Sequence, residues 1–226
     1  MIALRDVTKT YQVSKEVAVT AVRGVNLEVG QGEFVIITGR SGSGKTTLLN
    51  LAAGLVKPTS GEVRLGDVNL WSLSDREQSL LRNQKIGFVF QFPSLLPALT
   101  VSENVALPTT FGTNHTGASS HGRAAQLLDM VGLSDKLSVY PRQLSAGQQQ
   151  RVVIARALIR QPQVLLADEP TSNLDEQTER EIMDLFRDIH ARTGVTIVMV
   201  THTTQLVSYG TRAIEMASGL IVHHRV

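Results

Sequence analysis

Short, almost continuously apolar stretches alternate with stretches of helical periodicity along this chain. The strongest apolar stretches are residues 34–37, 164–167 and 195–200, the pattern of strands that are covered on both faces. Between the last two, residues 182–189 place apolar side chains at the i, i+3, i+4, i+7 spacing of a helix that packs on a sheet. This alternation predicts an α/β fold with a parallel sheet covered by helices on both faces.

The flanking segments predict further strands and a helical region. Residues 2–7 and 17–22 are rich in β-branched side chains, and residues 86–90 form another strand-like run. From residue 91 to about residue 161 the helical period dominates. A polar tract at residues 112–120 interrupts this region, and we expect it to be a loop.

Composition narrows the class of protein. A chain of 226 residues with 42% hydrophobic and 19% charged residues is ordinary for one large globular domain. The net charge of +2 gives no sign of a nucleic-acid partner, and the lack of cysteine excludes disulfides and thiolate metal sites. The N-terminus lacks the pattern of a secretory signal, and no run reaches about 18 apolar residues. We therefore expect any membrane role to require a partner.

One loop has the G-x-x-x-x-G-K-[ST] pattern of a phosphate-binding loop. It lies between the apolar run 34–37 and a helix-like run that starts at Thr47. We count Thr47 among the nucleotide-binding residues. Its residues are Gly39, Arg40, Ser41, Gly42, Ser43, Gly44, Lys45 and Thr46. A strand that turns through glycines into a helix presents backbone N–H donors and the positive end of a helix dipole to triphosphate oxygens. Lys45 would reach the β- and γ-phosphates, and the Thr46 hydroxyl would hold Mg²⁺.

A pair of carboxylates follows one of the buried strands. Asp168 and Glu169 come directly after the apolar run 164–167, at a strand end that should lie beside the phosphate-binding loop. Asp168 can therefore orient Mg²⁺, and Glu169 can polarise the attacking water as a general base. The pair predicts hydrolysis of the bound triphosphate.

A second anion-binding element lies 100 residues after Lys45. Ser145 and Gln148 have the Ser-x-x-Gln spacing of a capping box that opens a helix over residues 149 to about 160. The free N–H groups at the start of this helix favour an anion. One triphosphate hardly needs two such sites in one domain. We therefore expect this element to meet the γ-phosphate held by a second copy of the chain.

Here the chain resembles the ATP-binding subunits of ABC transporters, whose signature is Leu-Ser-Gly-Gly-Gln. The corresponding residues are Leu144-Ser145-Ala146-Gly147-Gln148, and the resemblance covers essentially the whole chain. It implies ATP as the nucleotide, ATP hydrolysis as the activity and a homodimer that encloses the nucleotides. It also implies one P-loop ABC ATPase domain over residues 1–226, with a RecA-like mixed or parallel sheet and an N-terminal antiparallel β subdomain. The core would take about residues 1–90 and 161–226, and an α-helical signature subdomain about residues 91–160.

The resemblance assigns roles to further residues. Tyr11 would stack on adenine, Gln91 would contact Mg²⁺ and the lytic water, and His202 would contact the γ-phosphate. Residues 172–175 match the loop that crosses the dimer interface. The chain departs from the family at Ala146, which replaces the first glycine of the signature. Because Gly147 is retained for the backbone approach to phosphate, we expect a working site.

The segment after Gln91 predicts a docking surface. Residues 90–105 are unusually apolar for a connection, and two prolines stiffen it. The segment is similar to that of the lipoprotein-releasing and macrolide-efflux ATPases, with the cell-division ATPase close by. The resemblance implies a peripheral subunit on the cytoplasmic face of the inner membrane, paired beneath two membrane subunits that dock near residues 91–100.

Other functions fit parts of this pattern. Within transport, the alternative is the ATPase of an importer that works with a solute-binding protein. ABC-type ATPases of DNA repair insert a long coiled coil between phosphate loop and signature, and no sustained heptads or basic stripe occur here. A small-molecule kinase would not require the signature. The sequence does not specify a cargo, because the motor never needs to touch it.

Overall fold

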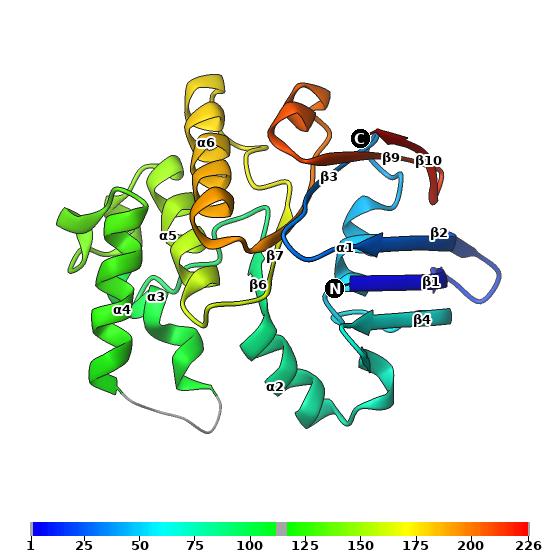
Figure 1. Cartoon of the computed structure of the whole chain (residues 1–226), viewed down its shortest axis with the longest axis horizontal. Helices are drawn as coiled ribbons and strands as arrows, with labels where there is room; N and C mark the ends of the chain where they lie inside the picture. The colour runs from blue at the N-terminus through cyan, green and yellow to red at the C-terminus, as the bar shows by residue number, and fades with distance from the viewer. Residues whose placement is uncertain (1, 112–116, 226) are drawn as a thin grey trace.

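The computed structural model describes residues 2–111 and 117–225, and within them two sheets form (Figure 1). The first sheet is antiparallel, with the strand order β2-β1-β4-β5. Its strands are β1 (Ile2–Gln12), β2 (Ala18–Val29), β4 (Ser60–Leu65) and β5 (Val68–Asn69). The strands expected at residues 2–7 and 17–22 are therefore present and longer than the sequence pattern indicated.

The second sheet contains the strands predicted to be buried on both faces. Its order is β10-β9-β3-β8-β7-β6, parallel from β9 to β6 with β10 antiparallel at the edge. The strands are β3 (Phe34–Thr38), β6 (Ile86–Val89), β7 (Val164–Asp168), β8 (Thr196–Val200), β9 (Arg212–Ala217) and β10 (Leu220–Arg225). Every residue of β3, β7 and β8 is buried. The α/β class with a largely parallel central sheet is confirmed.

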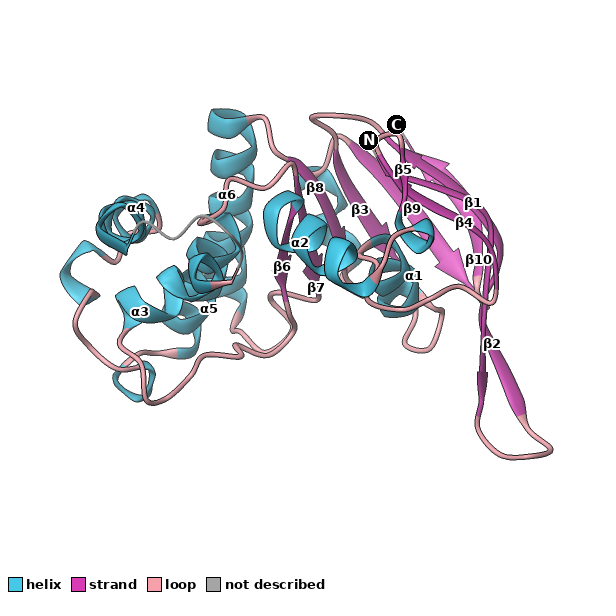
Figure 2. Ribbon diagram, turned by 90° about the horizontal axis from the view of Figure 1, so that it is seen from below, coloured by secondary structure: helices cyan, strands magenta, loops and turns pink. Residues whose placement is uncertain are grey.

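The helices lie on both sides of this sheet (Figure 2). The α-helices are α1 (Lys45–Ala52), α2 (Asp75–Lys85), α3 (Val101–Ala106), α4 (Gly117–Met130), α5 (Ala146–Leu158) and α6 (Glu176–Thr193). Short 3₁₀ helices are η1 (Leu70–Ser72), η2 (Leu107–Thr110), η3 (Ser134–Lys136), η4 (Pro141–Gln143) and η5 (Thr204–Tyr209). None of the described helices is long and apolar enough to span a membrane.

Alternate residues of the central strands supply two hydrophobic cores. Ile36 and Leu165 face one core, which the side chains of α3, α4, α5 and α6 complete. Ile37 and Leu166 face the other, which α1 and the antiparallel sheet complete. Strand side chains point alternately to opposite faces, so a continuously apolar strand fills both cores at once.

One sequence expectation needs correction. The polar tract was expected to be a loop throughout, but α4 begins at Gly117, so residues 117–120 are helical; the rest of the tract, residues 112–116, lies outside the described residues. The apolar stripe of α4 at Ala124, Leu127 and Leu128 is buried against α3 and α5. Packing of that stripe stabilises the helix.

Candidate functional site

The predicted phosphate-binding loop joins β3 to α1, as expected, and its glycines hold it in shape. Gly39, Gly42 and Gly44 have φ values of 151°, 77° and 101°, in the region that favours glycine. A Cβ at Gly44 would lie 2.2 Å from the carbonyl oxygen of Ala21, and a Cβ at Gly39 would lie 2.3 Å from that of Met216. These two glycines therefore also let the loop pack against β2 and β9.

Lys45 starts α1 and is only 4% exposed. Its Nζ donates hydrogen bonds to the carbonyl oxygens of Gly39 (2.8 Å) and Arg40 (3.1 Å), so the side chain folds back along the loop. Its Nζ also lies 3.9 Å from Glu169 Oε1. The ammonium group is thus held between the loop and the carboxylate that follows β7, where a terminal phosphate would neutralise it further.

Thr46 and Asp168 bring the loop and the end of β7 together. Thr46 Oγ1 donates a hydrogen bond of 3.0 Å to Asp168 Oδ1. Burial raises the pKa of Asp168 and Glu169 raises it further, whereas the Thr46 hydrogen bond and Lys45 lower it. A cation beside this carboxylate would favour its ionised form.

The oxygen atoms of Thr46 and Asp168 suit Mg²⁺ as ligands. A hydroxyl and a carboxylate are hard oxygen ligands, and Mg²⁺ on a nucleotide needs only one or two protein groups besides phosphate and water. In the described ranges, no three His, Cys, Asp or Glu side chains cluster as a metal site would require. The pair Thr46 and Asp168 therefore suits a metal that arrives with a nucleotide.

Glu169 follows β7 directly and contacts both Lys45 and His202. Its φ of 43° is a left-handed conformation, which a non-glycine residue adopts at a cost of about 1–3 kcal/mol and which clusters at active sites. Its backbone N–H donates to the carbonyl oxygen of Val200 (2.9 Å), which ties it to β8. Glu169 Oε2 lies 2.9 Å from His202 Nδ1, so the carboxylate is oriented between Lys45 and His202.

Gln91 and Tyr11 lie at two further sides of this region. Gln91 follows β6, and its Nε2 donates to Ser172 Oγ (3.3 Å) on the segment after β7. Tyr11 is 38% exposed and pairs with Val19 of β2, two residues before Ala21, which contacts the phosphate loop. An exposed ring in that position can stack on a base.

The signature residues lie apart from the phosphate-binding loop. The predicted capping box is present, with Ser145 Oγ accepting from the Gln148 N–H (3.3 Å) and Gln148 Oε1 accepting from the Ser145 N–H (3.0 Å). The helix they open begins at Ala146, three residues earlier than expected. In both ribbon views β6 and β7 lie between α5 and α1 (Figures 1 and 2). One chain therefore joins Lys45 and Thr46 to the acidic pair, but not to the signature.

Sequence reasoning missed one residue that connects these parts. Arg156 on α5 donates to the carbonyl oxygen of Ser94 (2.6 Å), and burial lowers the pKa of its guanidinium. It therefore holds the expected docking segment against the signature helix. The only signal in the sequence was a charged residue within the apolar run of α5.

This fold and this loop–carboxylate arrangement define a P-loop nucleotide-binding ATPase. A sequence model of the family described as ABC transporter matches residues 22–172. The chain belongs to the ABC transporter family, as an ATP-binding and ATP-hydrolysing domain. The family and activity expected from the sequence are confirmed, and the role of each site residue stays a prediction.

Relatives in this family extend over the whole chain. It is 49% identical to an uncharacterised ABC transporter ATP-binding protein of Thermotoga maritima, over 96% of this chain and 92% of that one. It is 44% identical to the lipoprotein-releasing system ATP-binding protein LolD of Geobacter metallireducens, over 98% of each. It is 43% identical to the macrolide export ATP-binding/permease protein MacB of Syntrophobacter fumaroxidans, but spans only 31% of that protein.

A solved structure supports the same assignment. An archaeal ATP-binding cassette, solved as a dimer in a post-hydrolysis state bound to ADP and Pi, matches with a TM-score of 0.90. The two chains are 42% identical, and the match covers 100% of this chain and 98% of the other. The predicted ABC ATPase fold is confirmed.

Proposed function

We propose that this chain is the motor subunit of a bacterial ABC system, in which two copies enclose two MgATP and drive a membrane partner. The observation that carries the proposal is the separation of the signature residues from the phosphate-binding loop within one chain. Each copy then holds two unlike half-sites for ATP. A face-to-face pair completes both, and the dimeric archaeal cassette supports this arrangement.

Within one copy, the described contacts support a task for each residue. The loop N–H groups and Lys45 would hold the phosphates, and Tyr11 would stack on the base. When bound with ATP, Mg²⁺ at Thr46, Asp168 and Gln91 would neutralise charge on the phosphates. Glu169, oriented by His202 at 2.9 Å, would take the proton of the attacking water.

The opposite copy would supply Ser145, Gly147 and Gln148. The first turn of α5 is held in shape by its capping box and is exposed at Ser145 and Ala146. Its N–H groups and helix dipole favour the terminal phosphate. Ala146 is therefore exposed, so its methyl group is not packed in the chain. Gly147 is buried and packs closely against Thr178.

Gly147→Ala tests the signature geometry. The added Cβ would lie 2.5 Å from Thr178 Cγ2 on α6, so the start of α5 must shift. Such overpacking costs about 1–3 kcal/mol. A rise of about 1.4 kcal/mol in the activation free energy lowers a rate tenfold. We therefore expect ATP hydrolysis, measured as steady-state phosphate release, to fall about tenfold.

Two companion variants make this test specific. Thr178→Ser in the Gly147→Ala background removes the clashing carbon and keeps the hydroxyl that donates to Asp175, so hydrolysis should recover. Ala146→Gly restores the family glycine at a cost of at most about 1 kcal/mol to the helix, and we expect the rate to change by less than about twofold. Full activity in Gly147→Ala, or no recovery in the double variant, would refute the geometry.

The docking segment has the surface that a membrane partner needs. Phe90 and Phe111 are 41% and 61% exposed and line a cavity of about 250 Å³, and Phe92, two residues after Phe90, is 64% exposed. Exposed aromatic side chains in one region mark protein interaction sites. Gln91 ties the segment to Ser172 near the site, and Arg156 ties it to α5. Closure of the dimer would therefore move the docked partner.

Phe92→Ser should weaken capture of the membrane subunit by about 10- to 100-fold, because burial of a phenyl side chain contributes about 1.5–3 kcal/mol. The measurement is binding of the purified chain to the detergent-solubilised membrane subunit that co-purifies with the native chain. The control is Leu55→Ser, which removes another large, exposed apolar side chain, 46% exposed, from the turn after α1. Equal losses in both variants would mean that Phe92 has no special part in docking.

The names of the relatives favour one kind of partner. LolD and MacB relatives support a membrane subunit for export, lipoprotein release or force transmission, with this chain bound peripherally at the cytoplasmic face of the membrane. The alternative is an importer ATPase. Purification of the native complex tests the choice: a partner with a large extracytoplasmic domain supports the proposal, and a many-helix permease with a solute-binding protein contradicts it.

We further propose that the chain works as one cassette, with a core of about residues 1–90 and 161–226 and a helical subdomain of about residues 91–160. The packing of α3, α4 and α5 with each other supports this division.

A further inference from the structure

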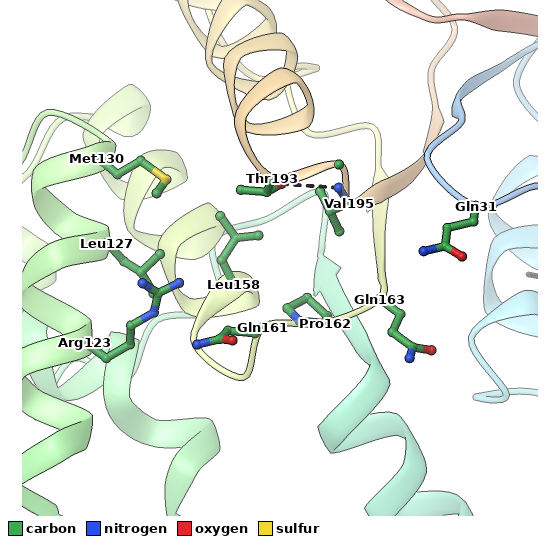
Figure 3. A pocket seen from close by; sticks show the side chains of 11 residues that line it. Gln31, Arg123, Leu127, Met130, Leu158, Gln161, Pro162, Gln163, Thr193 and Val195 are labelled. Atoms are coloured by element: carbon green, nitrogen blue, oxygen red, sulfur yellow. Dashed lines mark hydrogen bonds between the residues drawn. The ribbon is translucent and has the colours of Figure 1, made fainter.

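A second cavity, of about 490 Å³, lies between α4 and the central sheet (Figure 3). Arg123, Leu127 and Met130 of α4 form one wall. The opposite wall consists of the turns that precede β3, β7 and β8 and includes Gln163 and Val195. Its volume falls in the range of small-molecule sites, about 300–1,000 Å³.

This cavity is separate from the nucleotide site. Gln31, Gln163 and Val195 lie just before β3, β7 and β8, whereas the phosphate-binding loop and Glu169 follow the ends of β3 and β7. These strands are parallel, so the cavity lies at their N-terminal ends and the nucleotide site at their C-terminal ends. A molecule in the cavity would therefore not compete with ATP.

The cavity has one cation and no carboxylate among its lining residues. Among the residues that the structure describes, buried Arg123 Nε has no hydrogen-bond partner, and Nη1 makes one long contact, 3.4 Å to Gln126 Oε1. Within the described ranges Arg123 forms no ion pair. Few buried donors in proteins lack a partner, so the Arg123 guanidinium has hydrogen-bonding capacity to spare, and its charged end lines the cavity, where an anion would bond to it.

The remaining lining suits an apolar body with a polar end. Leu127, Leu158, Pro162 and Val195 supply apolar surface next to Arg123. The side-chain amides of Gln31, Gln161 and Gln163 also line the cavity. The lining is thus about half polar and half apolar, which suits a small molecule with an apolar body and a polar end.

We propose that this cavity binds a small organic anion, a carboxylate on an apolar body, with the carboxylate at Arg123 and the body against Leu127 and Leu158. A molecule bound there would contact both α4 and the turns that precede β3, β7 and β8. It is independent of the nucleotide site and does not rest on the proposed motor function.

Octanoate is the probe, titrated into the intact chain while the methyl resonances of Met, Leu and Val are followed by NMR. We expect saturable shifts at Leu127, Met130, Leu158 and Val195. Octanamide, which keeps the apolar chain but lacks the charge, should bind about tenfold more weakly, because a hydrogen bond to a charged group is stronger than a neutral one. Saturating MgATP should leave the octanoate affinity unchanged.

Arg123→Gln should weaken octanoate binding by about tenfold or more. The matched control is Arg76→Gln, the same change at an exposed arginine of α2, which should leave the affinity unchanged. Absence of saturable shifts at the cavity methyl groups would overturn the proposal. Equal binding of octanamide, equal affinity in Arg123→Gln, or displacement of octanoate by MgATP would do the same.

Discussion

Replacement of Glu169 by glutamine should lower ATP hydrolysis by about 10²–10⁴-fold, the contribution of a positioned general base. The amide keeps the size of the side chain and can still bond to His202, 2.9 Å away, but it cannot accept the proton of the attacking water. Lys45 remains at the loop, so ATP affinity should change little. Steady-state phosphate release and equilibrium ATP binding measure the two quantities separately.

The control for this variant is Glu28→Gln, the same change at an exposed glutamate of β2. It should hydrolyse ATP at the unmodified rate. If Glu169→Gln turns over ATP rapidly, the base has been assigned to the wrong residue.

Lys45→Ala should lower ATP affinity by about 10- to 100-fold, because it removes a charged donor that would contact the terminal phosphates. Dimer closure should be lost with ATP binding. Lys45 also donates to the carbonyl oxygens of Gly39 and Arg40, so the loop loses two internal hydrogen bonds in the variant. Equilibrium binding of a fluorescent ATP analogue measures the affinity, and a thermal melt checks that the chain still folds.

Lys57→Ala is the matched control, because Lys57 is exposed on the turn after α1. Its ATP affinity should equal that of the unmodified chain. Unchanged affinity in a folded Lys45→Ala variant would remove Lys45 from the phosphate site.

The features that sequence predicted correctly depend on local chemistry. The capping box at Ser145 forms as expected, because Ser145 and Gln148 are three residues apart. The buried strands follow from continuous apolar runs, and the apolar stripe of α6 is buried at Ile182, Phe186 and Ile189. The phosphate-binding loop, too, is a contiguous motif.

The features that sequence did not predict depend on distant contacts. The close approach of Gly44 to Ala21 and of Gly39 to Met216 joins segments far apart in the chain. The bond between Arg156 and Ser94 spans 62 residues, and no periodicity announces it. The cavity beside α4 likewise combines four separate segments. Residue type and spacing do not specify such contacts, because they arise only when the sheet and helices are assembled.

The central claim is that ATP joins two copies, each of which completes the other's site. Its most direct test is the molar mass of Glu169→Gln by size-exclusion chromatography with light scattering, with and without saturating MgATP. The account predicts a monomer without nucleotide or with MgADP, and a dimer with MgATP. A Glu169→Gln chain that binds MgATP to saturation and stays monomeric would contradict it.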